Sequence, residues 1–123
     1  KQAQATIEKL KEAIEYLQKE FVVYNPDGWL LISWPLEGES EFPQACSKND
    51  WKNCLCIIDA YLKTVGNLAD ESKICVEISK RTVVKGDLRY SQFGEVKQGL
   101  IGISSPLGLS IDNENGIVTI SRK

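Results

Sequence analysis

The sequence predicts an α+β fold in which an N-terminal amphipathic helix packs on a mostly antiparallel, disulfide-bonded sheet of about seven short strands. Three observations predict this fold. Residues 1–20 have apolar side chains at helical spacing, residues 21–123 contain short strand-like runs separated by turn residues, and the chain has four cysteines. A chain of 123 residues has the size of one domain, so we expect a single domain that is mainly β from residue 21 onward.

The composition excludes several classes of function. The chain has no histidine, which removes Ser-His-Asp and Cys-His nucleophile pairs and histidine-ligated zinc or haem. Its 15 Lys and Arg against 17 Asp and Glu give a net charge of −2, so charge gives no reason to expect nucleic acid or an anionic membrane as a partner. We therefore expect no cofactor and no bound metal, and the sequence favours a non-enzymatic role.

The N-terminal segment is the clearest element of the sequence. From Gln2 to Glu20 it contains no glycine or proline. Its apolar residues recur every three or four positions, as in a helix with a heptad seam: Ala3, Ile7, Leu10, Ile14, Leu17 and Phe21. We favour packing of this seam on the domain's own sheet. The alternative is self-association, with the segment forming the lower half of a longer helix that leads from a membrane segment or a filament core.

Two segments after this helix predict a β-hairpin. Phe21–Tyr24 is apolar, Asn25–Gly28 has the composition of a turn, and Trp29–Trp34 is a second apolar run. Because Trp29–Trp34 has apolar side chains on both faces, we expect it to be a central strand.

The rest of the chain contains further strand signals and one helical signal. Asn115-Gly116 between two alternating runs predicts a tight hairpin. The expected elements are a strand from Cys54 to Ile58, a short helix over 59–68, a strand from Cys75 that runs on through Thr82–Val84, and strands at Leu100–Ile103, Leu107–Ile111 and Ile117–Ile120.

The polar segment Leu36–Trp51 predicts a long loop of the kind that often carries function. Trp51 lies between Asp50 and Lys52, so we expect its side chain to be exposed. We interpret Trp51 as part of a contact surface with three alternating carboxylates: Glu37, Glu39 and Glu41.

The cysteines predict a disulfide framework, because an even number in a short chain is typical of one. They are Cys46, Cys54, Cys56 and Cys75. Residues two apart in a strand have Cα atoms about 6.5–7 Å apart, which disfavours a bond between Cys54 and Cys56. We prefer Cys46–Cys54 with Cys56–Cys75, because the strands of Cys56 and Cys75 can lie side by side, and the crossed pairing stays open. A four-thiolate metal site usually uses two Cys-x-x-Cys pairs, so the Cys-x-Cys spacing disfavours that alternative.

The start of the chain and the cysteines predict a compartment. The chain begins with Lys1 and contains no methionine, so we expect that a preceding segment has been removed and that any anchor preceded Lys1. Together with disulfides this favours an extracytoplasmic protein, either secreted or on the cell surface. The alternative is a cytosolic protein with reduced thiols.

Three motifs resemble those of small uncharacterised archaeal proteins in which one N-terminal membrane segment precedes a cysteine-containing outer domain. The motifs are Gly28–Pro35, Phe42-Pro43-x-x-Cys46 and Cys54-Leu55-Cys56-Ile57, within roughly residues 21–78. The resemblance implies an anchored, extracytoplasmic domain with disulfides and no known activity. The chain lacks the third cysteine that the more cysteine-rich members have just after the position of Ile57. In architecture alone, the chain is also similar to the soluble part of type IV pilin-like subunits.

These observations predict a non-enzymatic extracytoplasmic domain that binds another surface component or assembles with copies of itself through the N-terminal helix. Its membrane contact would be made only by a segment outside this chain. One alternative is a small hydrolase that uses the carboxylates of Glu37, Glu39 and Glu41. A further alternative is a cytosolic module that binds metal through its cysteines.

Overall fold

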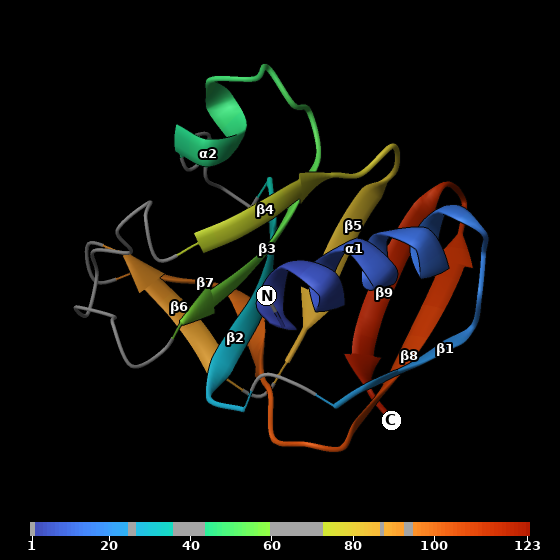
Figure 1. Cartoon of the computed structure of the whole chain (residues 1–123). Helices are drawn as coiled ribbons and strands as arrows, with labels where there is room; N and C mark the ends of the chain where they lie inside the picture. The colour runs from blue at the N-terminus through green and yellow to red at the C-terminus, as the bar shows by residue number, and fades with distance from the viewer. Residues whose placement is uncertain (1, 25–26, 36–43, 60–72, 87, 93–94) are drawn as a thin grey trace.

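The fold consists of an N-terminal helix, a short second helix and two β-sheets (Figure 1). A computed structural model describes residues 2–24, 27–35, 44–59, 73–86, 88–92 and 95–123. The helices and strands have these bounds: α1 Gln2–Glu15, β1 Glu20–Val23, β2 Trp29–Trp34, α2 Gln44–Ser47, β3 Cys54–Asp59, β4 Lys73–Glu77, β5 Arg81–Lys85, β6 Leu88–Gln92, β7 Glu95–Gly102, β8 Leu107–Glu114 and β9 Ile117–Arg122.

The nine strands found in the described residues form two sheets. Sheet I has the order β1-β8-β9-β5, and sheet II has the order β4-β3-β2-β7-β6. The paired strands are antiparallel except β5 and β9, which are parallel. The α+β class and the mostly antiparallel pairing are as predicted, but the strands number nine rather than about seven and are divided between two sheets.

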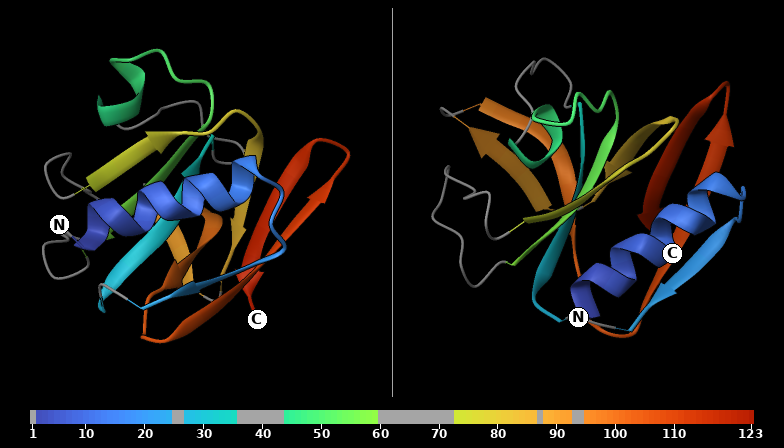
Figure 2. Two further views of the ribbon diagram at one scale, coloured as in Figure 1. Left: turned by 45° about the vertical axis from the view of Figure 1, so that its right-hand side comes forward. Right: turned by 45° about the horizontal axis from the view of Figure 1, so that its top comes forward.

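Helix α1 packs on the chain's own strands, contacting β3 and β4 of sheet II and β1 of sheet I (Figure 2). Ala3, Ile7, Leu10 and Ile14 of the predicted seam are all buried. The helix ends at Glu15 because Leu17 has a left-handed backbone, with φ of 60°, and is exposed. The predicted seam therefore belongs to the domain core as far as Ile14 and does not continue through Leu17.

The hairpin expected between Phe21–Tyr24 and Trp29–Trp34 is absent. Strand β1 pairs with β8 of sheet I, whereas β2 lies in sheet II. The physical reason is that β2 is central, as predicted, so β3 and β7 occupy both of its edges. With no free edge on β2, β1 completes the other sheet.

Two other strand predictions have different outcomes. The strand expected to run from Cys75 through Thr82–Val84 is broken at residues 78–80, and its halves, β4 and β5, lie in different sheets. The hairpin predicted at Asn115-Gly116 is confirmed, because β8 and β9 pair around that turn. Asn115 and Gly116 have φ of 56° and 79°, as the mirror-image turn of a tight hairpin requires.

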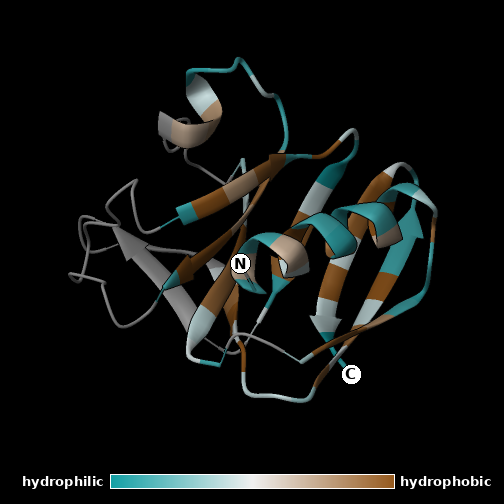
Figure 3. Cartoon of the chain, in the orientation of Figure 1, coloured by the Kyte–Doolittle hydropathy of each residue, from teal (hydrophilic) through white to brown (hydrophobic). Residues whose placement is uncertain are grey.

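The two faces of sheet II contribute to two separate apolar clusters. The front cluster lies between α1 and the two sheets, where the apolar residues of the strands are visible behind the helix in Figure 3. Its buried members are Ala3, Ile7, Leu10, Ala13, Ile14, Val23, Leu31, Leu55, Ile57, Val76, Ile78, Val84, Ile101, Ile103, Leu107, Leu109, Ile111, Val118 and Ile120. The back cluster lies on the opposite face of sheet II, and its buried members are Ile32, Trp34, Cys46, Cys54, Cys56, Ile58 and Leu100.

The predicted long loop over Leu36–Trp51 contains a short helix, α2, which the sequence analysis missed. Its four residues are too few to leave a detectable helical period. Residues 36–43 of this segment, and the helix expected over 59–68 apart from Asp59 at the end of β3, lie outside the described residues.

Candidate functional site

Strand β3 positions the cysteines through its alternation. Leu55 and Ile57 point into the front cluster, whereas Cys54, Cys56 and Ile58 point into the back cluster. All five side chains are buried, so β3 is covered on both faces. Because residues two apart share a face of a strand, the Cys-x-Cys spacing places both sulfur atoms on the back of sheet II.

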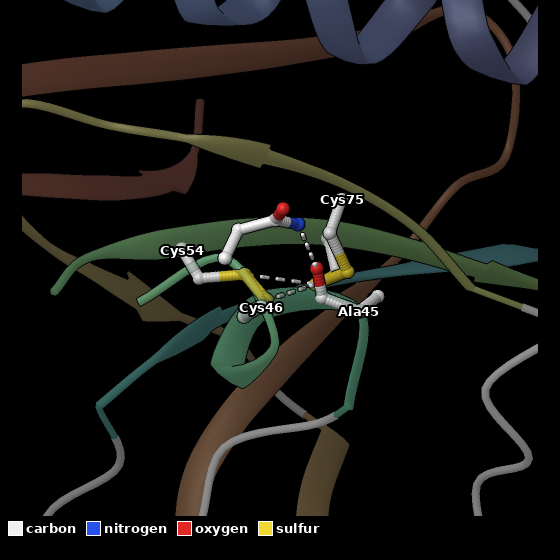
Figure 4. Close-up of a disulfide and its surroundings, with 6 residues drawn as sticks. Ala45, Cys46, Cys54 and Cys75 are labelled. Carbon is white, nitrogen blue, oxygen red and sulfur yellow. Dashed lines mark hydrogen bonds between the residues drawn. A yellow bond between two sulfur atoms is a disulfide. The ribbon is translucent and has the colours of Figure 1, made fainter. Parts of the chain in front are cut away.

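The two disulfides follow the pairing that we preferred from the sequence. Cys46 of α2 is bonded to Cys54, and Cys56 is bonded to Cys75 of β4. Cys56 and Cys75 are directly opposite each other in the β3–β4 ladder, with their Cα atoms 4.1 Å apart. Figure 4 shows the bond that links α2 to β3, with Cys75 beside it.

The two disulfides lie against each other. The Sγ atom of Cys56 is 3.8 Å from that of Cys46 and 3.5 Å from that of Cys54. All four Sγ atoms lie within 4.8 Å of one another. We call these four side chains the sulfur cluster. This convergence is not predictable from the sequence, because no sequence signal places α2 over Cys56.

The segment after α2 places an aromatic side chain against the back cluster. Asp50 has a left-handed backbone, with φ of 57°, and reverses the chain so that the Trp51 amide donates a hydrogen bond to the Cys46 carbonyl at 3.3 Å. The Trp51 side chain packs against the back cluster and is half-buried. It is thus less exposed than the sequence predicted, because the apolar surface of the cluster is available to it.

The other members of the predicted contact surface, Glu37, Glu39 and Glu41, lie outside the described residues. The structure therefore does not place these carboxylates beside Trp51 or beside one another.

A second candidate surface lies at the free edge of sheet I, where β1 is the outermost strand. Val22 and Tyr24 have exposed fractions of 46% and 64%, while Val23 between them is buried. A hollow separates this edge from α1, and it is lined by Gln2, Ala5, Thr6, Lys9, Phe21, Val22, Val23 and Tyr24.

This edge was not predicted from the sequence, because the expected hairpin paired β1 with β2. A signal was nevertheless present in the strand compositions. Exposed edge strands usually contain charged residues, lysine above all, that oppose pairing with another chain. The other three edge strands, β4, β5 and β6, each contain Lys or Arg, whereas the only charged residue of β1 is Glu20 at its first position.

One carboxylate among the described residues has a perturbed titration. The Ser79 amide and hydroxyl donate hydrogen bonds of 3.0 and 2.5 Å to the two carboxylate oxygens of Glu15. Partial burial alone would raise the pKa of Glu15, but the Ser79 hydrogen bonds and the nearby Lys11 and Lys80 together lower it below its ordinary value. This contact ties the end of α1 to the turn between β4 and β5, so its evident role is structural.

The structure also bears on the compartment. The chain has two disulfides, and disulfides persist in oxidising compartments. The two bonds therefore suggest an oxidising environment outside the cytoplasm. Within the residues that the structure describes, no helix has the length and apolarity needed to cross a membrane.

Comparisons with known protein families, with curated proteins and with solved structures find no match to this chain.

Proposed function

We propose that the chain is a non-enzymatic extracytoplasmic domain of a membrane-anchored or pilin-like surface protein, and that it assembles with a second copy of itself through the free edge of β1. The observation that carries this proposal is the exposed apolar edge formed by Val22 and Tyr24. An edge strand has unpaired backbone N–H and C=O groups, which can bond to another extended chain.

The composition of the β1 edge supports a second copy as the occupant. Antiparallel pairing of two β1 strands around a two-fold axis at Val22 would place Val22 opposite its own symmetry mate and Tyr24 opposite Glu20. Both contacts would lie on one face of the sheet, because Glu20 and Val22 of β1 and Tyr24, the residue after it, are at alternate positions and are all exposed. Such an interface is self-complementary, as two-fold dimers require.

Helix α1 does not offer its apolar seam for self-assembly, so we assign the interface to strand β1. The seam residues Ala3, Ile7, Leu10 and Ile14 are buried in the chain's own core and are not available to another copy. The hollow between α1 and β1 leaves room for an added strand beside the helix.

Two further observations support the cellular placement. The two disulfides support a location outside the cytoplasm. The resemblance over residues 21–78 supports an anchor that precedes the domain.

The test measures the association state of the purified oxidised chain by sedimentation velocity over a wide range of concentrations. We expect a monomer–dimer equilibrium that Val22→Lys weakens by at least about tenfold in Kd, because two lysines would face each other across the axis. Ile117→Lys is the matched control. Ile117 is 45% exposed, close to the 46% of Val22, but lies on β9 of the same sheet.

A third variant separates the β1 edge from the surface predicted at Trp51. We expect Trp51→Ala to leave the dimer unchanged, because Trp51 packs on sheet II and not near β1. A chain that stays monomeric up to its solubility limit would overturn self-assembly. Equal weakening by Val22→Lys and Ile117→Lys, or weakening by Trp51→Ala alone, would overturn the assignment to β1.

A further inference from the structure

The sulfur cluster has a geometry that two disulfides do not require. Two independent disulfides have no reason to lie in contact, yet Cys56 Sγ is 3.8 Å from Cys46 Sγ and 3.5 Å from Cys54 Sγ, to neither of which it is bonded. The four sulfur atoms come from three elements, α2, β3 and β4, and converge within 4.8 Å. They therefore form one compact group on the back of sheet II.

These separations match the requirement of a metal bound by four thiolates. Zinc–sulfur bonds are about 2.3 Å long and tetrahedral, which places the sulfur atoms about 3.8 Å from one another. The distances from Cys56 Sγ to the two sulfurs to which it is not bonded, 3.8 and 3.5 Å, are already near that value. Once the disulfides are broken, the two bonded sulfur pairs have to separate, and Cys75 Sγ, which lies within 4.8 Å of the other three sulfurs, has to settle about 3.8 Å from each of them.

The backbone arrangement explains why the unusual Cys-x-Cys spacing is compatible with such a site. Cys54 and Cys56 share a face of β3, and Cys75 lies opposite Cys56 on the neighbouring strand. Cys46 approaches the same face from α2. The adjacent strand and α2 thus supply the third and fourth ligands that a second Cys-x-x-Cys pair supplies in common zinc sites.

The surroundings favour a soft metal bound by sulfur alone. Cys46, Cys54 and Cys56 are buried, and the rest of the back cluster consists of the apolar side chains Ile32, Trp34, Ile58 and Leu100. The chain has no histidine to compete as a ligand. Four cysteine ligands select zinc over hard cations such as magnesium and calcium.

We propose that the reduced form of this domain binds one zinc ion through the thiolates of Cys46, Cys54, Cys56 and Cys75. Each disulfide accepts two electrons and two protons from a dithiol reductant, which becomes a disulfide, and yields two cysteine thiols. Zinc binding then releases the four thiol protons and leaves a ZnS4 centre with a charge of −2. The cluster thus has two alternative closed states, two disulfides under oxidising conditions or one zinc ion under reducing conditions. Each state ties α2 to sheet II.

The test uses the full chain, reduced with dithiothreitol and desalted without oxygen, and Co²⁺ as a spectroscopic probe for zinc. We expect one Co²⁺ per chain, with thiolate charge-transfer bands in the near ultraviolet, the visible bands of tetrahedral cobalt, and displacement of Co²⁺ by Zn²⁺. The oxidised chain should show none of these bands. Zinc should also raise the Tm of the reduced chain, followed by circular dichroism.

Two variants on α2 assign the site. Cys46→Ser removes one ligand and should weaken Co²⁺ binding by at least about tenfold and change the charge-transfer bands. Ser47→Ala changes the neighbouring exposed residue and should leave binding and spectrum unchanged. If the reduced chain stays folded without binding Co²⁺, or unfolds and does not refold with zinc, the proposal is wrong. A Cys46→Ser spectrum identical to that of the unaltered chain would also overturn it.

Discussion

The two faces of sheet II are stabilised in different ways, although they share the same strands. The front cluster is aliphatic, extends over both sheets and is closed by the long helix α1. The back cluster is smaller, includes three cysteines among its buried members, and is closed by the four-residue helix α2 and the half-buried Trp51. An isolated helix of one turn is not stable in water, so α2 depends on its attachments.

This difference indicates why the cysteines are where they are. The front cluster buries enough apolar surface to hold α1 without a covalent bond. The hydrogen bonds between Glu15 of α1 and Ser79 add only local support. The back cluster lacks such a cover and is closed by bonds from β3 to α2 and to β4. Apolar burial thus dominates on one side of the sheet, and covalent linkage dominates on the other.

The largest expected effect comes from Leu10→Ala in the front cluster. Leu10 is 1% exposed at the centre of the α1 seam, so its truncation should leave a cavity and lower the free energy of unfolding by about 3–4 kcal/mol. Urea denaturation measures this change as a lower urea concentration at the midpoint of unfolding, with an unchanged dependence of the free energy of unfolding on urea.

The control for this variant is Glu12→Ala on the exposed side of the same helix, which should change stability by less than about 0.5 kcal/mol. If both variants had equal effects, α1 would not be part of the core. The front cluster would then not be the self-sufficient side of the molecule.

The next largest effect is expected from removing the covalent link between β3 and β4 in a Cys56→Ala, Cys75→Ala double variant. This bond closes a loop with a sequence separation of 19, so chain entropy predicts a loss of about 3 kcal/mol. The Cys46–Cys54 bond spans 8 positions, and its removal by the corresponding double variant should cost about 2.5 kcal/mol.

Hydrogen exchange shows whether the loss is confined to the back of the sheet. We expect the amides of β4 to exchange faster in the Cys56→Ala, Cys75→Ala variant. The exchange rates of the α1 amides should increase less than those of β4. Uniform acceleration across both elements would contradict the proposed division between the two sides.

The sequence predicted the parts of the fold that depend on local signals. The seam through Ile14, the central position of β2 and the Asn115-Gly116 turn each follow from the spacing or conformational preference of a few neighbouring residues. The pairing of Cys56 with Cys75 was also predictable, because both lie in strand-like runs that could be neighbours.

The parts that sequence reasoning missed depend on contacts between distant segments. Strand β1 pairs with β8, more than 80 residues later, because β2 has no free edge. The Cys-x-Cys spacing disfavoured a metal site in the sequence. Sequence spacing, however, relates only residues that are close in the chain, and it does not reveal that α2 brings Cys46 beside Cys56. Both candidate sites, the β1 edge and the sulfur cluster, depend on this long-range arrangement.

The smallest expected effect is that of Glu15→Gln, which tests the local contact that supports the front side. Glu15 accepts two hydrogen bonds from Ser79 as a carboxylate, and its pKa is lowered in the folded chain despite the opposing effect of partial burial. The glutamine amide has a single acceptor oxygen, and its NH2 group cannot accept the second hydrogen bond, so the variant should be about 0.5–1 kcal/mol less stable at pH 7, after allowance for solvent screening.

The pH dependence of this difference gives a sharper test than its size. A lowered folded pKa means that the carboxylate stabilises the fold above its ordinary pKa of 4.5, and that this contribution is lost as the pH falls through the folded pKa. The two proteins should therefore differ at pH 7 and converge in urea denaturation curves below pH 4.5. Glu12→Gln, on the exposed side of the same helix, provides the matched charge change. If the Glu15→Gln difference grew as the pH fell, the Ser79 contact would not be what holds the end of α1.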